Sequence, residues 1–283
     1  MEIVNTVAQV RKIVKDWRKH GLTVGFVATM GYLHEGHKSL IEKSVIENDR
    51  TVVSIFVNPM QFGPNEDLES YPRDLKRDAS LCKVTGADLI FNPEPSEMYQ
   101  DNFCTSVNVD NITSGLCGRS RPVHFGGVCT VVNKLFNIVT PDNAYFGEKD
   151  AQQLAVIKRM VRDLNIDINI VGCPIVRESD GLAKSSRNTY LNTEERKAAL
   201  VLSRSLKKAK EKLNNSERSA DEIISTIRSE IESEPLAKID YIEVVDSLEL
   251  QPVKKIEGDV LVAIAVYIGK TRLIDNFTFN FSD

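Results

Sequence analysis

Uninterrupted apolar stretches that alternate with helix-like stretches constrain this chain more than any other feature of its sequence. The run Thr51–Val57 consists mostly of β-branched residues and lacks the polar alternation of a half-exposed strand. Such a run is typical of a parallel strand that is covered on both faces. Parallel strands are joined by crossover connections, which are usually helices. The sequence therefore predicts an α/β fold in which helices cover both faces of a parallel sheet.

Periodicity places the elements of this sheet along the first two thirds of the chain. Strands are predicted at Leu22–Ala28, Thr51–Val57, Asp88–Phe91, Ala144–Phe146 and Asp167–Val171. Helical spacing begins after His37 and is also present at Arg73–Thr85, Thr130–Val139 and Ala151–Leu164. Ligands of such sheets bind beyond the carboxyl ends of the strands, so the residues that follow each strand are the first candidates for a site.

The pattern changes near Pro174. Residues 176–188 are polar, rich in small side chains and without apolar periodicity. Helices and then strands are predicted beyond them, at Thr193–Leu213, Ser219–Glu232, Ile239–Val245, Val260–Ile268 and Leu273–Phe279. A turn at Gly269–Arg272 would join the last two strands as an antiparallel pair. We therefore predict two domains: residues 1–175 carry the parallel sheet, and residues 176–283 form a smaller α+β domain with an antiparallel sheet.

Composition limits the partners of the protein. Its 283 residues are enough for two domains, and 42% hydrophobic with 27% charged residues is ordinary for a globular protein. The net charge of −4 provides no basic field for nucleic acid or an anionic membrane. The first residues lack a leader pattern, and no apolar run approaches the length of a membrane span. We expect a cytoplasmic protein that binds small molecules and neither nucleic acid nor membrane.

The five cysteines are odd in number, dispersed and free of C-x-x-C spacing. This pattern predicts reduced thiols that fill the core. The residues are Cys82, Cys104, Cys117, Cys129 and Cys173.

The segment Thr29–His37 indicates specific chemistry more strongly than any other. His34 and His37 are half of the four histidines in the chain, and they follow a predicted strand where a helical pattern starts. The N-terminus of a helix offers unpaired N–H groups and the positive end of its dipole to a phosphate. Two imidazoles at that point could donate hydrogen bonds to phosphate oxygens and stabilise charge that develops during phosphoryl or adenylyl transfer. The segment therefore predicts a nucleotide site.

Two other interpretations of the histidine pair remain open. Residues three apart can share a metal ion, but Gly36 lies between these two, the pair is at a turn, and no nearby cysteine or acid completes a ligand set. The two histidines could also be ordinary surface residues, although their clustering favours function. We predict no metal ion held by protein ligands.

Polar clusters follow two further predicted strands. Asn58–Phe62 comes after the second strand, and Gly147–Asp150 comes after a later one. Polar groups from several strand ends would meet at one crevice of a parallel sheet.

Five motifs together resemble the pantoate–β-alanine ligase family. They are Thr-Met-Gly-x-Leu-His-x-Gly-His, Phe-Val-Asn-Pro-x-Gln-Phe, Arg-Pro-x-His-Phe-x-Gly-Val, Phe-Gly-Glu-Lys-Asp-x-Gln-Gln and Ser-Ser-Arg-Asn, at Thr29–His37, Phe56–Phe62, Arg121–Val128, Phe146–Gln153 and Ser185–Asn188. The histidine motif alone indicates the wider HxGH nucleotidyltransferase superfamily, whereas the second and fourth motifs are more specific. The match is loose beyond Leu213.

The resemblance implies a Rossmann-like catalytic domain, a C-terminal lid domain and an ATP-dependent ligation in two steps. The carboxylate of pantoate would attack the α-phosphate of ATP, which gives pantoyl adenylate and pyrophosphate. The amine of β-alanine would then attack the activated carbonyl, which gives pantothenate and AMP. ATP would be a substrate, Mg²⁺ would be held mainly through its phosphates, and the protein would be a homodimer.

The resemblance also implies roles for residues of the matching motifs. His37, His34 and Lys149 would be catalytic and would contact ATP, with His37 as a proton donor. Gln61 and Gln153 would bind pantoate, and Gln61 would also bind β-alanine. The other ATP-binding residues would be Met30, Gly31, Tyr32, Leu33, Glu35, Gly36, Gly147, Glu148, Asp150, Val176, Lys184, Ser185, Ser186 and Arg187.

Simpler interpretations exist for some of these residues. Lys149 could be a solvated surface lysine, and Val176 could be a core valine. Gln152, next to Gln153, is expected to point elsewhere on its helix and to serve as an internal control.

Two other functions stay open. A different HxGH adenylyltransferase, acting on a phosphorylated substrate such as phosphopantetheine, would need a second basic pocket. A non-catalytic nucleotide-binding module would have no need of groups aimed at a transition state.

Overall fold

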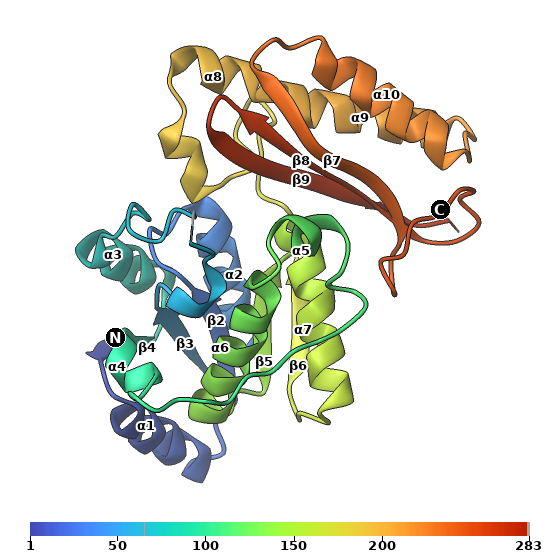
Figure 1. Ribbon diagram of the computed structural model, residues 1–283. Helices are drawn as coiled ribbons and strands as arrows, with labels where there is room; N and C mark the ends of the chain where they lie inside the picture. The colour runs from blue at the N-terminus through green and yellow to red at the C-terminus, as the bar shows by residue number, and fades with distance from the viewer. Residues whose placement is uncertain (65, 282–283) are drawn as a thin grey trace. The chain divides into compact units, whose positions relative to one another are not determined.

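The structure is a computed structural model that describes residues 1–64 and 66–281. The chain forms two compact units (Figure 1). Unit 1 consists of Met1–Asp110, Arg121–Glu148 and Gln153–Pro174, and unit 2 consists of Asn111–Ser120, Lys149–Gln152 and Ile175–Asp283.

Unit 1 contains a six-stranded sheet with the strand order β1-β4-β3-β2-β5-β6, and all its pairs are parallel. The strands are β1 (Glu2–Val4), β2 (Val24–Thr29), β3 (Arg50–Ile55), β4 (Leu89–Phe91), β5 (Asn143–Gly147) and β6 (Asn169–Cys173). The chain runs outward from β2 through β3 to β4 and then returns to β5 on the other side of β2. Ligand sites of parallel sheets lie at such a reversal, beyond the carboxyl ends of the strands.

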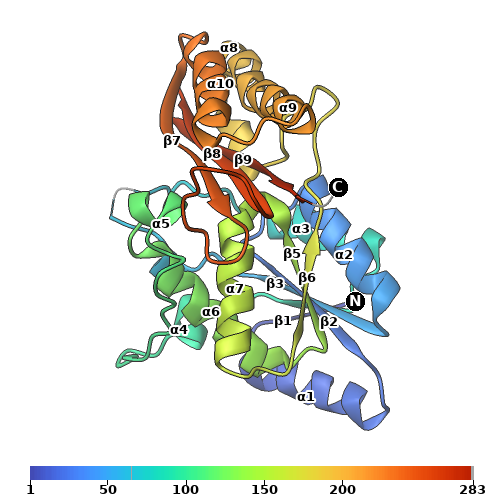
Figure 2. The same ribbon diagram turned by 90° about the vertical axis from the view of Figure 1, so that its right-hand side faces the viewer.

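Helices cover both faces of this sheet (Figure 2). α2 (Glu35–Glu47) and α3 (Leu75–Thr85) lie on one face and enclose a buried cluster that includes Ile41, Val53 and Tyr145. The other face carries α6 (His124–Val139) and α7 (Ala151–Asp163), and α1 (Val7–Lys19) packs against α6. The short helices η1 (Pro59–Gln61) and α4 (Pro95–Met98) also belong to this unit, and η2 (Glu148–Asp150) begins in it and ends in unit 2. The predicted α/β fold is confirmed.

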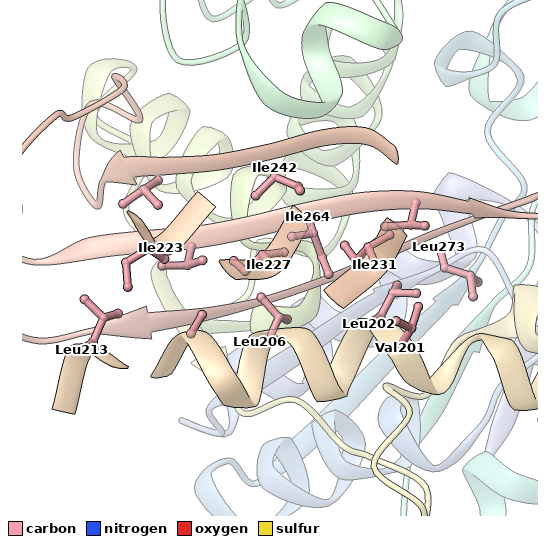
Figure 3. Packing of buried hydrophobic residues seen from close by; sticks show 14 of the residues in the cluster. Val201, Leu202, Leu206, Leu213, Ile223, Ile227, Ile231, Ile242, Ile264 and Leu273 are labelled. Atoms are coloured by element: carbon pink, nitrogen blue, oxygen red, sulfur yellow. The ribbon is translucent and has the colours of Figure 1, made fainter. Parts of the chain in front are cut away.

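Unit 2 is built on a three-stranded antiparallel sheet with the order β7-β8-β9. Its elements are α5 (Leu116–Ser120), η3 (Ser186–Tyr190), α8 (Thr193–Ala198), α9 (Leu200–Asn214), α10 (Ala220–Glu232), β7 (Ala237–Asp246), β8 (Val260–Ile268) and β9 (Thr271–Phe279). Apolar side chains of α9, α10 and the sheet meet in one layer, among them Leu206, Ile227 and Ile264 (Figure 3). The predicted α+β character and the antiparallel pair of the last two strands are confirmed.

The predicted helices and strands differ from the structure in three respects. β1 and α1 were not predicted, although Thr6 and Gln9 form a capping box at the start of α1. The single helix expected at Thr193–Leu213 is interrupted at Ala199, because Leu202 N donates to Ala199 O three residues back and the helical ladder restarts there. α6 also begins before the predicted Thr130.

Four of the five cysteines are buried and all five are unpaired thiols, but Cys104 is exposed. The prediction of a core position was therefore wrong for Cys104. Burial raises the pKa of the Cys82 and Cys129 thiols to about 12, which keeps both protonated at neutral pH.

The chain does not divide into two continuous blocks. Residues 111–120 and 149–152 pack with the unit that contains the C-terminal helices, although they precede residue 175. A domain boundary at 175/176 stays a prediction. In the part of the chain that the structure describes, every helix is too short or too polar to span a lipid bilayer.

The core of unit 2 gives a first test of the fold. Ile227 of α10 is fully buried, whereas Ser225 on the same helix is exposed. We expect Ile227→Ala to lower the free energy of unfolding by about 2–5 kcal/mol, because it leaves a cavity between helix and sheet. Ser225→Ala should change it by less than about 0.5 kcal/mol. Urea denaturation followed by circular dichroism measures both, and similar losses would contradict the packing described.

Candidate active site

The turn from β2 to α2 has an unusual backbone. Gly31 has a φ of +83° and Tyr32 a φ of +52°, both in the left-handed region. Glycine adopts this region freely, but a tyrosine must be held there by its surroundings. Thr29 Oγ1 accepts a hydrogen bond from Gly31 N at 3.2 Å and donates one to Ser54 O at 2.7 Å. The turn is thereby fixed to the ends of β2 and β3.

Asp78 of α3 holds the same turn from the other end. Its Oδ2 accepts from Tyr32 N at 2.8 Å, and its Oδ1 accepts from Leu33 N at 2.7 Å. The residue is 1% exposed, and burial raises the pKa of its carboxyl above the usual value while the two N–H donors oppose that rise. A carboxylate, which accepts at both oxygens, satisfies two N–H groups at once. Asp78 was not predicted as a site residue, and no spacing rule connects it with Tyr32, which lies 46 positions earlier.

His34 and His37 form a reciprocal cap at the N-terminus of α2. His34 is the N-cap residue, and its Nδ1 accepts from Gly36 N at 3.1 Å; the Nδ1 of His37 accepts from His34 N at 3.3 Å. The ring centroids are 4.1 Å apart. Since each Nδ1 accepts a hydrogen bond, the proton of each neutral ring lies on Nε2, and that atom is the donor. The site therefore places two ring N–H donors side by side at the N-terminus of a helix.

This geometry corrects one part of the sequence argument. His37 lies within the first turn of α2, with Glu35 and Gly36 before it, and the pair is not in a turn that precedes the helix. Glu35 is an acid in the first helical turn, where its charge is favourable to the helix dipole. Among the described residues, no group of three or more His, Cys, Asp or Glu side chains is arranged to hold a metal ion.

Gln61 lies in η1, just after β3, and reaches the histidine turn. It is 6% exposed, and its Nε2 lies 3.1 Å from Met30 Sδ while its Oε1 accepts from Asn58 Nδ2 at 3.1 Å. The structure thus brings together the predicted residues Met30 and Gln61. The polar segments after β2 and β3 meet at one edge of the sheet, as predicted.

The third motif supports Gln61 from α6. A Cβ atom on Gly127 would come within 2.4 Å of Met60 O and 2.5 Å of Gln61 N, so the close packing of α6 on η1 requires glycine. His124 Nδ1 lies 3.1 Å from Gln61 O, and Arg121 lies 3.2 Å from the other ring nitrogen of His124. The residues Arg121–Val128 therefore position the glutamine backbone.

The fourth motif begins at the end of β5 and continues into unit 2. Gly147 ends β5, which pairs with β2, and Glu148 starts η2. Lys149 and Asp150 belong to unit 2; Lys149 Nζ lies 3.8 Å from Asp150 Oδ1, and the lysine side chain is 19% exposed. This burial argues against a solvated surface lysine.

Strand β9 holds two segments that contain predicted ATP-binding residues. Asn276 Nδ2 donates to Lys149 O at 2.8 Å. The neighbouring Asp275, which is 1% exposed, accepts from both terminal nitrogens of Arg177 at 2.7 and 2.9 Å. Arg177 directly follows Val176, so adjacent residues of one strand fix the segments around Lys149 and Val176.

The polar stretch after Val176 is ordered. Val176 is half-buried, which is less than a core valine, and its carbonyl accepts from Lys184 N at 2.9 Å. Lys184 Nζ lies 4.0 Å from Glu178 Oε1, so its charge is partly offset. Ser185 caps η3 by accepting from Arg187 N at 3.3 Å.

Ser186 is buried at 8% exposure, and Arg187 is half-buried. The stretch predicted as irregular therefore contains η3. Of the predicted residues, unit 1 contains Met30–His37, Gln61, Gly147 and Glu148, and unit 2 contains Lys149, Asp150, Val176 and Lys184–Arg187. Convergence of both groups on one ATP molecule stays a prediction.

The two adjacent glutamines of α7 lie in different surroundings. Gln153 is half-buried. Gln152 is 6% exposed; its Oε1 accepts from Cys117 N, and its Nε2 donates to Ile112 O and Gly115 O, all at 2.9 Å. Its amide therefore holds the segment 111–120, and its use as an internal control for pantoate affinity stays a prediction.

The contacts of Asp78 generate a test of the turn. In Asp78→Asn, one carboxylate oxygen becomes an NH2 group that faces a backbone N–H and cannot accept from it. We expect the amide of Tyr32 or Leu33 to exchange its hydrogen at least about tenfold faster, with a loss of about 1–3 kcal/mol in the free energy of unfolding. Hydrogen exchange measures this, and Ser80→Ala, on the exposed part of α3, is the control. Unchanged exchange at both amides would refute the role given to Asp78.

Comparison with known proteins bears on the whole chain. The family model described as pantoate-beta-alanine ligase matches residues 2–278. A pantothenate synthetase of Enterococcus faecalis is 68% identical over 279 residues, which cover 99% of each chain. One of Clostridium acetobutylicum is 66% identical over 280 residues, which cover 99% of this chain and 100% of the relative.

Solved structures that resemble this chain come from the same family. The crystal structure of pantothenate synthetase from Thermus thermophilus superposes with a TM-score of 0.92 at 45% identity and covers 98% of this chain and 99% of that one. A pantoate-beta-alanine ligase of Francisella tularensis, crystallised as a complex with beta-gamma ATP and beta-alanine, gives a TM-score of 0.79 at 37% identity, with 98% and 97% covered. The chain therefore belongs to the pantoate-beta-alanine ligase family, as its five motifs predict.

Proposed function

We propose that this protein is an AMP-forming acid–amine ligase that condenses pantoate with β-alanine. In the first step a carboxylate oxygen of pantoate attacks the α-phosphorus of ATP, and the bond from that phosphorus to pyrophosphate breaks. In the second step the amine of β-alanine attacks the carbonyl carbon of pantoyl adenylate, the bond to AMP breaks, and the amine loses a proton. The products are pantothenate, AMP and pyrophosphate. Membership in the family supports this proposal.

The observation that carries the proposal is the reciprocal cap of His34 and His37. Negative charge grows on the α-phosphate oxygens as the carboxylate attacks, and donors that are fixed beforehand stabilise it. The two rings are held with their Nδ1 atoms on backbone N–H groups, so both present Nε2–H from the positive end of α2. Lys149 would add a compact positive charge for the phosphates.

The tautomer refines the role of His37. A neutral ring whose Nδ1 accepts from His34 N donates a hydrogen bond from Nε2. Full proton transfer, the role that the resemblance implies, would require protonation of Nδ1 and loss of that bond. We therefore assign hydrogen-bond donation to His37 and keep proton donation as a prediction.

The glutamine amides suit the organic acid. Gln61 lies against Met30 of the histidine turn, where a carboxylate about to attack the α-phosphate would have to bind. An amide can donate to a carboxylate and also bind hydroxyl groups. We propose that Gln61 and Gln153 bind pantoate and that Gln61 also meets β-alanine.

Three further properties belong to the proposal. Magnesium would accompany ATP and be held mainly by phosphate oxygens, which are hard ligands. For Asp78, which is 1% exposed and accepts backbone N–H groups at both carboxylate oxygens, we propose a role in holding the turn and not in binding this ion. The homodimer stays a prediction of the family resemblance, and the cytoplasmic location stays a prediction from composition.

An omission assay tests the function. Pyrophosphate release should require both ATP and pantoate, and formation of an amide should require β-alanine as well. Release with phosphopantetheine in place of pantoate would indicate the other adenylyltransferase. ATP binding without any release would indicate a non-catalytic module.

A substitution at His37 tests the mechanism. His37→Gln keeps a side-chain acceptor for His34 N, since glutamine is a favoured residue at this position of a capping box, but it removes the ring donor. We expect kcat for pyrophosphate release to fall roughly 100- to 10,000-fold, with the melting temperature little changed. Lys38→Gln, at an exposed neighbour, is the control. A kcat of His37→Gln within threefold of the wild type would refute the mechanism.

The α7 glutamines test the pantoate contact. Gln153→Ala should raise KM for pantoate about tenfold, as expected for loss of a hydrogen bond to a charged group. Gln152→Ala should instead lower the free energy of unfolding by about 1–3 kcal/mol, because buried backbone groups lose their partners. Lys158→Ala, at an exposed position of the same helix, is the matched control. An unchanged KM in Gln153→Ala would remove that residue from the site.

A further inference from the structure

Asn58 has a fully determined hydrogen-bond arrangement. It is 1% exposed, and its Nδ2 donates to Gly127 O and to Gln61 Oε1, each at 3.1 Å. Its Oδ1 accepts from Met60 N at 3.4 Å and from Tyr99 Oη at 2.7 Å. A backbone carbonyl can only accept and a backbone N–H can only donate, so Gly127 O and Met60 N fix which amide atom is which.

The orientation of the Asn58 amide determines the donor and acceptor roles of the Tyr99 hydroxyl and the Gln61 amide. Because Oδ1 faces Tyr99, the phenol must donate to it. Because Nδ2 faces Gln61, the Gln61 atom that it meets must be the oxygen, Oε1. The donor of the Gln61 amide is therefore turned toward Met30, whose sulfur is a weak acceptor. Gln61 therefore presents its NH2 group, which can donate a hydrogen bond to a substrate carboxylate. If the amide flipped, its oxygen would take the place of the NH2 group and would repel the carboxylate.

The Tyr99 ring is itself held firmly. Its centroid lies 5.0 Å from that of Phe103 and 6.3 Å from that of Phe56, and Lys134 Nζ lies 5.6 Å from it. Burial raises the pKa of the Tyr99 phenol well above its ordinary value, so the hydroxyl keeps its proton. The phenol is thus a rigid donor at the start of the chain Tyr99–Asn58–Gln61.

We propose that Tyr99 is a positioning residue of the ligase: through Asn58, its hydroxyl fixes the Gln61 amide with the NH2 group toward the carboxylate substrate. Tyr99 acts through another residue and does not itself need to touch the substrate. This proposal rests on the proposed function, because it assumes that Gln61 binds pantoate.

Removal of the hydroxyl has a defined expected effect. In Tyr99→Phe, Asn58 Oδ1 keeps only the long bond from Met60 N, so the Asn58–Gln61 contact loosens. We expect KM for pantoate to rise three- to tenfold while KM for ATP stays within twofold. Tyr267→Phe, which removes a hydroxyl from β8 in unit 2, should leave both KM values unchanged.

A double-mutant cycle separates positioning from a general structural role. If Tyr99 acts through Gln61, Tyr99→Phe should have no further effect on KM for pantoate in a Gln61→Ala background. Equal fold-changes in both backgrounds, a rise in KM for ATP equal to that for pantoate, or no change in Tyr99→Phe would each overturn the proposal. Any general loss of stability, followed by thermal unfolding, contributes equally to both backgrounds and cancels in the cycle.

The Gln61→Ala variant alone distinguishes failure of the role given to Tyr99 from failure of the proposed ligase function. An unchanged KM for pantoate in this variant would remove the substrate contact and with it the role of Tyr99. The ligase function would still stand if pyrophosphate release continued to require pantoate. Release that does not depend on pantoate in the wild type would overturn both.

Discussion

The hydrogen bonds from Tyr32 N and Leu33 N to the buried carboxylate of Asp78 are the contact on which the site depends. The left-handed residues of this turn set where α2 begins, and the start of α2 sets where the two histidine rings lie. An isolated buried carboxylate is unfavourable, and an isolated pair of buried N–H groups is unfavourable as well. Together they satisfy each other, so α3 fixes the loop whose residues are predicted to bind ATP.

The fold could be predicted from the sequence because its strongest constraint, the burial of parallel strands on both faces, acts on consecutive residues. A strand such as β3, buried from Thr51 to Ile55, does not alternate polar with apolar residues, and the run Thr51–Val57 shows this pattern directly. β1 was missed because a strand of three residues is too short to show a periodic pattern. α1 was also missed, although the capping box of Thr6 and Gln9 marks its start in the sequence. The break at Ala199 had no such sign, since alanine is the best helix former and tertiary packing decides the local step.

The site was predictable where residue type implies chemistry and unpredictable where it implies packing. Two histidines around a glycine, or an amide after a strand, indicate ligand chemistry by themselves. The hydrogen bonds of Asp78 with Tyr32 N and of Tyr99 with Asn58 join residues 46 and 41 positions apart, and no spacing rule connects such positions. Gln152 is a further example: the sequence predicts that it points elsewhere than Gln153, but not that its amide holds the backbone of Cys117 and Ile112.

The interleaving of the two units affects how the chain can assemble. The backbone passes between them at 110/111, 120/121, 148/149, 152/153 and 174/175. Ser120 bonds to Asp240, and Cys117 Sγ lies 3.3 Å from Tyr241 Oη, so early segments depend on strands that are synthesised more than a hundred residues later. During translation the segment 111–120 must wait for β7 to emerge, because pairings of high sequence separation form late. A fragment that ends at residue 175 would consequently leave the ribosome without the β7 partners of α5.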